Sequence, residues 1–190
     1  MTDKNAIAAH LQGLSETAER TGRELSEQIA AIATVMRECV ERGGKFMFCG
    51  NGGSAADAQH VATEYVVRFR RNRRPVAAIA LTTDTSLLTA AANDFGFDQI
   101  FERQVRALGR TDDLLFLHST SGESENLLLA ASAAREIGVR TVALLARGGG
   151  RLKDVVDHAL IVPTDNGAHA QELHLAISHA LCDLLESGWT

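Results

Sequence analysis

Residues 46–64, FMFCGNGGSAADAQHVATE, carry the clearest structural signal in the chain. The run Phe46–Cys49 is wholly apolar, as expected for a parallel strand that is covered on both faces. A turn follows with three glycines, which let the main chain adopt unusual angles and approach a ligand: Gly50, Gly52 and Gly53. Ser54 is then expected to cap a helix, whose free amides and dipole favour an anion such as a phosphate. The stretch therefore predicts a strand, a phosphate-binding turn and a helix.

The glycine turn matches neither of two familiar nucleotide-binding motifs. Its spacing differs from the dinucleotide fingerprint, and no lysine follows the glycines as it does in nucleoside-triphosphate loops. The simpler alternative is a tight strand-to-helix turn that binds nothing. The helix that follows places His60 and Glu64 one turn apart on one face. They form either part of an exposed, ion-paired helix face or part of an acid–base or metal site.

Composition and charge restrict the class of protein. The 190 residues, 45% hydrophobic and 23% charged, suit a single globular domain. The net charge of −5 argues against a nucleic-acid surface. The one basic cluster, residues 68–74, is either a solvated helix end or a surface for an anionic substrate or a neighbouring subunit.

The cysteines and the apolar runs bear on location. Three cysteines without metal-type spacing predict a reducing compartment and no disulfide framework, and Cys49 is interpreted as a core residue rather than a nucleophile. The N-terminus is polar and no apolar run reaches the length of a membrane span. We therefore expect a cytoplasmic protein without membrane contact.

The rest of the chain alternates between apolar runs and helical patterns. Residues 1–43 predict two helices separated at Gly22, whose apolar stripes suit packing against partner subunits or against their own sheet. Apolar runs then predict five strands, at residues 46–49, 75–81, 114–117, 139–145 and 159–162. This alternation predicts an α/β fold, a three-layer sandwich with a five-stranded parallel sheet, in one structural domain.

A second polar turn leaves the third predicted strand. It gathers four hydroxyl groups beside Gly122, from Ser119, Thr120, Ser121 and Ser124. Hydroxyl donors and helix-start amides suit a phosphate monoester, whereas the simpler alternative is a helix start rich in capping residues. If the first and third strands are neighbours, this serine turn and the glycine turn line one crevice at the carboxyl edge of the sheet.

The last predicted helix, over residues 168–187, carries two polar side chains that point away from its apolar stripe. Gln171 and His179 lie about 80° apart around the axis and about 12 Å apart along it. With His60 and Glu64 they are candidates for an acid–base or metal site. They can meet one ion only at nearly full extension or where subunits share the site. His174 lies nearer the apolar stripe and is interpreted as structural.

Three segments together resemble the sugar isomerase (SIS) domain family. They are Gly50–His60, Asn93–Gly96 and Ser119–Gly122, which read GNGGSAADAQH, NDFG and STSG. The resemblance covers about residues 44–186. Within the family, the sequence looks most like the isomerases of seven-carbon sugar phosphates. It implies a flavodoxin-like SIS domain over residues 44–190, preceded by an oligomerising helical pair over residues 1–43.

The resemblance also implies an activity, a cofactor and an assembly. The expected reaction converts sedoheptulose 7-phosphate into D-glycero-D-manno-heptose 7-phosphate through an enediol, for bacterial lipopolysaccharide or capsule heptose. The expected assembly is a homotetramer with active sites at subunit interfaces. The residues expected to contact the phosphosugar are Asn51, Gly52, Gly53, Ser54, Asp94, Ser119, Thr120, Ser121, Ser124 and Gln171. One zinc ion per subunit is expected on His60, Glu64, Gln171 and His179, with Glu64 and His179 as the catalytic residues.

Glu64 thereby has two expected roles that compete. As a base it would move a proton between neighbouring carbons, while His179 or a zinc ion stabilises the oxyanion. As a firm zinc ligand it would lose basicity. The sequence leaves this choice open.

Three positions depart from the family's pattern. Glu123 stands where Asn is usual, His118 stands where a small or apolar residue is usual, and residues 166–170 lack the usual Arg-Ile pair. These departures bear on substrate preference more than on chemistry. Two alternatives stay open: an isomerase of another phosphosugar, and a non-catalytic SIS sensor or scaffold of the type that associates with the bacterial replication initiator. The scaffold type typically lacks counterparts of Glu64 and His179, so their presence favours an enzyme.

Overall fold

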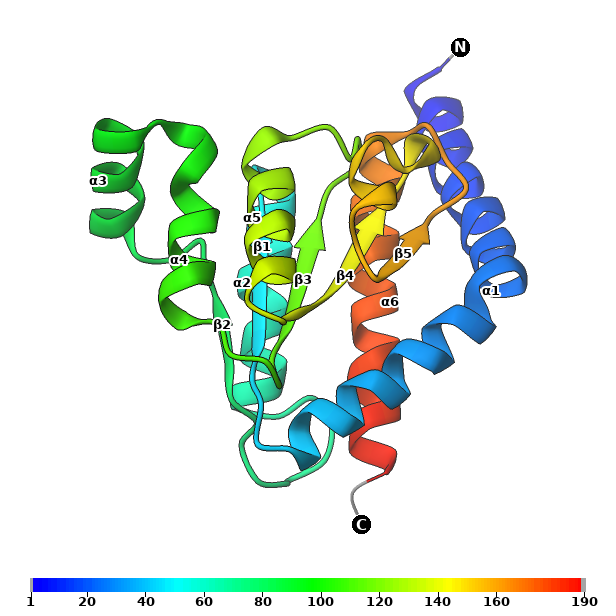
Figure 1. Ribbon diagram of the computed structural model, residues 1–190. Coiled ribbons are helices and arrows are strands. Elements are labelled where there is room, and N and C mark those ends of the chain that lie inside the picture. The colour runs from blue at the N-terminus through cyan, green and yellow to red at the C-terminus, as the bar shows by residue number, and fades with distance from the viewer. Residues whose placement is uncertain (1, 189–190) are drawn as a thin grey trace.

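A computed structural model describes residues 2–188 of the chain as a layered α/β fold (Figure 1). Five parallel strands form one sheet in the order β2-β1-β3-β4-β5. The strands are β1 (Phe46–Gly50), β2 (Ala78–Ala80), β3 (Leu114–His118), β4 (Arg140–Leu145) and β5 (His158–Ile161). The predicted α/β fold class and the predicted five-stranded parallel sheet are confirmed.

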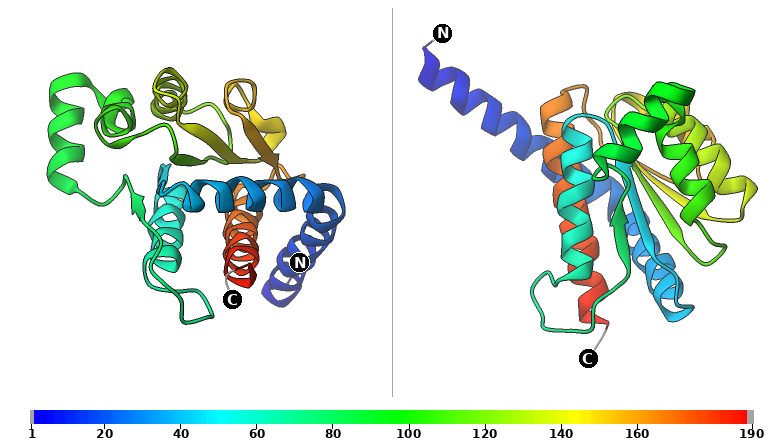
Figure 2. Two further views of the ribbon diagram at one scale, coloured as in Figure 1. Left: turned by 60° about the horizontal axis from the view of Figure 1, so that its bottom comes forward. Right: turned by 90° about the vertical axis from the view of Figure 1, so that its left-hand side faces the viewer.

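Within residues 2–188, six α-helices and three short 3₁₀-helices connect and cover the strands. The α-helices are α1 (Asp3–Glu41), α2 (Gly53–Val66), α3 (Thr85–Phe95), α4 (Ile100–Leu108), α5 (Glu125–Glu136) and α6 (Gly167–Ser187). The 3₁₀-helices are η1 (Phe97–Gln99), η2 (Arg147–Gly149) and η3 (Leu152–Asp154). Helices α1, α2 and α6 cover one face of the sheet, and α4 and α5 cover the other, with α3 beside α4 (Figure 2). Among the described residues, no helix has both the length and the apolarity that crossing a membrane requires.

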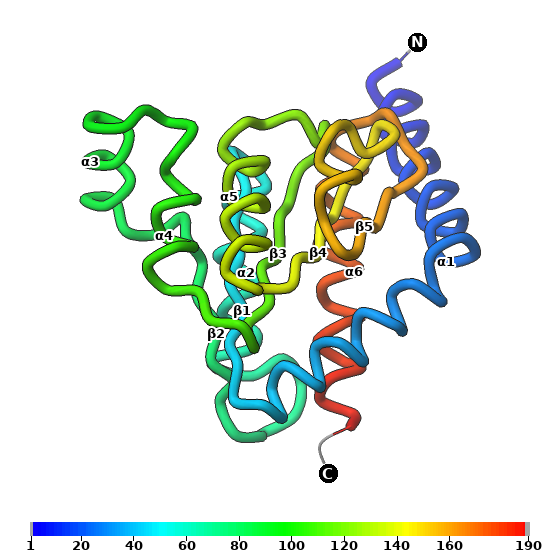
Figure 3. Tube along the Cα trace, in the orientation of Figure 1, coloured from blue at the N-terminus to red at the C-terminus, as the bar shows by residue number. Residues whose placement is uncertain are grey.

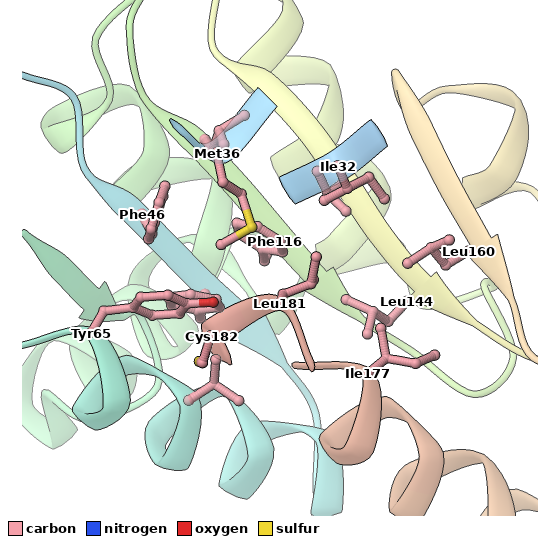
Figure 4. Close-up of a cluster of buried hydrophobic side chains, with 14 of the residues drawn as sticks. Ile32, Met36, Phe46, Tyr65, Phe116, Leu144, Leu160, Ile177, Leu181 and Cys182 are labelled. Atoms are coloured by element: carbon pink, nitrogen blue, oxygen red, sulfur yellow. The ribbon is translucent and has the colours of Figure 1, made fainter. Parts of the chain in front are cut away.

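Alternate residues of the central strands supply two separate cores. Phe46 and Phe48 face α1, α2 and α6, whereas Met47 and Cys49 face α4 and α5. This is why the predicted strands read as continuous apolar runs rather than as alternating patterns. Figure 4 shows how the first core is assembled from α1 (Ile32, Met36), from strands (Phe46, Phe116, Leu144, Leu160), from α2 (Tyr65) and from α6 (Ile177, Leu181, Cys182).

The N-terminal region is one helix, not the predicted pair. Helix α1 has 39 residues and passes through Gly22 without interruption. Glycine weakens a helix but does not end it unless the backbone turns away, and Gly22 keeps a negative φ. The axis of α1 changes direction part-way along its blue segment (Figure 3). The hydroxyl of Ser26 donates to the carbonyl of Gly22, a bond that bends helices.

The bounds of one predicted strand also need correction. Strand β2 is shorter than predicted, because the amide of Val76 bonds the carbonyl of Tyr65 at the end of α2 instead of joining the sheet.

The basic cluster over residues 68–74 is only partly solvated. The side chain of Arg73 is 6% exposed and lies 3.1 Å from the buried carboxylate of Glu186 near the end of α6. Glu186 also accepts hydrogen bonds from the amides of Phe69, Arg70 and Arg71. Burial alone would raise the pKa of Glu186, but these donors hold it below its usual value. The cluster therefore ties the ends of α2 and α6 together.

Two buried histidines lie beneath the carboxyl edge of the sheet. His118, at the end of β3, is fully buried, and neither ring nitrogen has a hydrogen-bond partner within the described part of the chain. His174 donates from Nε2 to the carbonyl of Leu145 at 3.0 Å. Burial lowers the pKa of His118 to about 3 and that of His174 to about 4. Both rings are therefore neutral near pH 7, and His118 is a core residue rather than a substrate contact.

The buried histidines predict loss of stability in acid. Since their folded-state pKa values lie below the ordinary value of 6.5, the unfolded chain binds more protons as the pH falls from about 6.5 to 4. Each ring then removes up to about 1.4 kcal/mol of stability per pH unit. We expect His118→Phe to flatten the pH dependence of the free energy of unfolding, measured by urea titration. His158→Gln, at a partly exposed ring, is the control. Equal slopes in wild type and His118→Phe would contradict this account.

Candidate active site

Two loops meet at the carboxyl edge of the sheet. Strands β1 and β3 are hydrogen-bonded neighbours, and Gly50 is in register with His118. The glycine turn after β1 and the serine turn after β3 therefore leave the sheet side by side. This is the point where the strand order reverses, which is the usual ligand site of such sheets.

The glycine turn presents its backbone to solvent. Gly52 caps α2 with a φ of 57° and a ψ of −122°, angles that favour glycine. Ser54 is not the cap, as the sequence suggested, but lies within the first helical turn and is buried. A Cβ on Gly53 would lie 2.6 Å from the side-chain nitrogen of Gln171. A side chain at Gly53 would therefore displace the amide end of Gln171, which α6 places against this turn.

Asn51 is held by a residue that the sequence analysis did not identify. Its side-chain nitrogen donates to Oδ1 of Asn126, and that of Asn126 donates back to Oδ1 of Asn51, both at 2.9 Å. Asn126 is buried in the first turn of α5. The paired amides fix the glycine turn to the serine turn. No local sequence pattern predicts this contact, because Asn51 and Asn126 are 75 residues apart in the sequence.

The serine turn is held in shape by some of its own hydroxyl groups. The hydroxyl of Ser119 accepts from the amide of Gly122 at 2.9 Å, and that of Ser121 accepts from the amide of Glu123 at 3.3 Å. Within the described residues, the hydroxyls of Thr120 and Ser124 make no hydrogen bond, although Ser124 stands at the N-cap of α5. They remain available to a ligand beside the helix start.

The charge of Glu123 is balanced within the chain. Its carboxylate lies 2.8 Å from Nε of Arg151, and it also accepts from the amide of Arg151 at 3.0 Å. The hydrogen bonds from the Arg151 side chain hold the pKa of Glu123 below its usual range. Arg151 contacts Glu125 as well. Arg151 thus offsets the negative charge that Glu123 brings to the serine turn.

Three of the four predicted metal ligands come together on α2 and α6. The Nε2 atoms of His60 and His179 lie 3.2 Å apart, and His60 Nε2 lies 3.3 Å from Oε1 of Glu64. One ligand atom from each of the three residues lies within 4.8 Å of the others. Tetrahedral zinc with Zn–N bonds near 2.0–2.1 Å separates two imidazole nitrogens by about 3.3 Å. The donor set and its spacing therefore fit such an ion.

The surroundings of His179 keep it neutral. Burial lowers its pKa, and nearby His60 lowers it further, while Glu64 opposes the shift. The ring of Phe69 stacks on it with ring centres 5.1 Å apart. A neutral, oriented imidazole can bind a metal or exchange a proton with a substrate oxygen.

Gln171 and Asp94 also lie away from this cluster in the single chain. Gln171, the fourth predicted ligand, lies at the glycine turn, eight residues before His179 and about 12 Å along α6. Asp94 lies on α3, in a hollow of about 360 Å³ between α3 and α4. The position of Gln171 follows from the parallel packing of α2 with α6. This packing places Gly53 opposite Gln171 and His60 opposite His179.

Asp57 is a further candidate that the sequence analysis did not select. Its Oδ2 atom is buried and has no hydrogen-bond partner among the described residues. Burial raises the pKa of its carboxyl group, and His60 opposes the rise. Asp57 lies on α2 between the glycine turn and His60. An unpaired carboxylate there suits contact with a ligand or a neighbouring subunit.

Comparison with known proteins identifies the family that the sequence motifs resemble. The model of a family described as SIS domain matches residues 9–146. The chain belongs to the SIS domain family. It is 51% identical over 160 residues to a phosphoheptose isomerase of Akkermansia muciniphila, covering 84% of this chain and 83% of that protein.

Solved structures extend the similarity to the whole fold. A phosphoheptose isomerase from Francisella tularensis superposes with a TM-score of 0.95 at 40% identity, covering 98% of this chain and 100% of that one. One from Neisseria gonorrhoeae gives a TM-score of 0.93 at 42% identity, with coverage of 98% and 100%. Within its family, this SIS chain is therefore similar to phosphoheptose isomerases over nearly its full length.

The tight fit of the serine turn predicts a specific sensitivity. Gly122 has a φ of 68°, and a Cβ there would lie 1.9 Å from the carbonyl oxygen of Gly149. Gly148 has a φ of 75° and open space around it. Both alanine variants pay about 1–2 kcal/mol for the backbone angle, but only Gly122→Ala must displace the turn. We expect it to weaken binding of inorganic phosphate at least tenfold by calorimetry, and Gly148→Ala to bind normally. Equal affinities would show that the turn does not hold phosphate.

Proposed function

We propose that this chain is a phosphoheptose isomerase that converts sedoheptulose 7-phosphate into D-glycero-D-manno-heptose 7-phosphate. The observation that carries the proposal is the meeting of Glu64 with His60 and His179 on α2 and α6. A carboxylate beside imidazoles can move a proton between carbon atoms, which a passive sugar-phosphate sensor does not need. The relatives at 40–51% identity are named for this activity.

The phosphate group is assigned to the two turns at the edge of the sheet. Hydroxyls of Thr120 and Ser124, with amides at the starts of α2 and α5, supply neutral donors without a lysine. Ser119 and Ser121 shape the turn. The remaining proposed contacts to the phosphosugar come from Asn51, Gly52, Gly53, Ser54, Gln171 and Asp94.

Glu64 is proposed as the base. Its carboxylate takes a proton from C1 of the ketose, next to the carbonyl carbon, and the electron pair of that C–H bond forms the C1–C2 double bond of an enediol. The carboxylate exchanges this proton with water, and a proton from solvent is then delivered to C2, which yields the aldose. When no metal is bound, His179 donates a proton to the oxygen on C2 as charge develops there, and regains one from the oxygen on C1. No proton is gained or lost overall.

Zinc is the proposed metal, held by His60, Glu64 and His179 with Gln171 as the fourth expected ligand. When bound, it supplies Lewis-acid polarisation of the substrate's carbonyl oxygen. The two expected roles of Glu64 exclude each other if the metal–carboxylate bond is tight. The 3.3 Å contact between Glu64 and His60 supports both, since it orients the carboxylate in either role.

A homotetramer with shared active sites is the proposed assembly. His60 follows Gly53 by seven residues, so the His–Glu cluster lies about 10 Å along α2 from the phosphate turns. Neighbouring subunits can close this distance by supplying one half of the site each. The first half of α1 carries exposed apolar side chains, Ile7 at 62% and Leu11 at 58%, that suit burial between subunits. Residues 1–43 are therefore assigned to oligomerisation and residues 44–190 to the SIS domain.

A cytoplasmic location is proposed, in support of lipopolysaccharide or capsule heptose synthesis. All three cysteines are free thiols and buried. Burial raises the pKa of Cys39 and of Cys182 to about 12 and raises that of Cys49 too, so none is a ready nucleophile. Free thiols suit a reducing compartment.

Replacement of the proposed base tests the function. We expect Glu64→Gln to lower kcat for sedoheptulose 7-phosphate by about 10²–10⁴-fold, because an amide cannot accept the proton. Substrate affinity, measured by calorimetry, should change little. Glu136→Gln, at an exposed residue on α5, is the matched control and should keep full activity.

Two outcomes would contradict the proposal. Loss of substrate binding along with turnover in Glu64→Gln would remove the base assignment. Absence of turnover in the folded, zinc-supplied wild type would favour another phosphosugar or a non-catalytic SIS protein.

A further inference from the structure

A second cluster of metal-binding side chains lies between α1 and α6. Nδ1 of His10 lies 3.3 Å from Nε2 of His169, and Nε2 of His10 lies 4.0 Å from Oε1 of Glu172. One ligand atom from each of the three residues lies within 4.8 Å of the others. His169 is buried, whereas the side chains of His10 and Glu172 are each 45% exposed. The cluster thus has one fixed donor and two at the solvent edge.

A glycine in α1, Gly13, allows the close approach of α1 to His169. A Cβ on Gly13 would lie 3.1 Å from Cε1 of His169, so glycine lets α1 approach the buried ring closely. Residues 3–12 of α1 are all exposed in the chain. The contacts of His10 therefore join an otherwise solvated helical segment to the start of α6.

The donor chemistry matches that of the first cluster. Each cluster has two imidazoles and one carboxylate, and the nitrogen–nitrogen separations are 3.3 Å here and 3.2 Å between His60 and His179. Two nitrogens on one tetrahedral zinc-sized ion lie about 3.3 Å apart. The solvent-exposed side leaves room for water as a fourth ligand. Imidazole and carboxylate ligands suit zinc and neighbouring divalent transition metals.

We propose that His10, His169 and Glu172 form a second divalent-metal site, separate from the His60–Glu64–His179 cluster. The ion clamps the first half of α1 to the first turns of α6. Because His169 and Glu172 flank Gln171 in the sequence, the clamp also steadies the segment that presses against the glycine turn. The role is structural, and the site stands whether or not the chain is an isomerase.

Metal counting with single variants tests the site. Zinc is titrated into metal-free protein by equilibrium dialysis, and bound zinc is measured per chain. We expect His10→Gln to bind one ion fewer than wild type and His179→Gln to lose a different one, so that the double variant loses both. His158→Gln, at a partly exposed histidine outside both clusters, should match wild type.

The difference in bound zinc per chain between wild type and His10→Gln tests whether the second metal site exists. Equal zinc binding in these two proteins would overturn the proposal. Glutamine suits an exposed helical position, so the variant should fold, which circular dichroism verifies. Glu172→Gln provides a second test and should weaken the same ion at least tenfold. Zinc should also raise the Tm of His179→Gln but not that of the double variant.

Discussion

The pairing of β1 with β3 is the constraint on which the candidate site depends. Because these two strands are neighbours in a parallel sheet, the turns that follow them leave the same edge together. The sheet can hold this order because both its faces are covered, with separate apolar cores on the two sides. The paired amides of Asn51 and Asn126 then lock the two turns to each other. The phosphate cradle that we propose depends on strand order and helix starts, with neutral hydroxyl and amide donors.

The parallel packing of α2 with α6 provides the second half of the chemistry. It places His60 opposite His179 and Gly53 opposite Gln171, and the buried Glu186 fixes the far ends of both helices to the segment after α2. The reactive cluster is therefore set by helix packing, whereas the phosphate turns are set by the sheet. In a single chain, the His60–Glu64–His179 cluster and the two turns lie apart along α2. We therefore propose that an assembly of subunits completes the site.

Much of this organisation could be predicted from the sequence, and the exceptions have physical causes. Apolar runs identified the strands, most clearly the central β1, β3 and β4, because strands buried on both faces leave a continuous signal. Helix spacing identified His60 with Glu64 and the separation of about 12 Å between Gln171 and His179. It did not show that His179 faces His60, because that contact depends on how two helices pack. The uninterrupted α1 was missed because a glycine alone does not show whether a helix bends or ends. Contacts between distant residues, such as Asn51 with Asn126 or His10 with His169, leave no local pattern.

The central claim is that proton transfer interconverts a ketose and an aldose on this chain. The most direct measurement is NMR of the sugar after incubation of the purified, zinc-supplied protein with sedoheptulose 7-phosphate in D₂O. The account predicts an aldoheptose 7-phosphate that carries deuterium at C2, because a carboxylate base exchanges its proton with water before returning it. Aldose without deuterium would contradict a solvent-exchanging base at Glu64. Absence of aldose from folded protein would contradict the isomerase assignment itself.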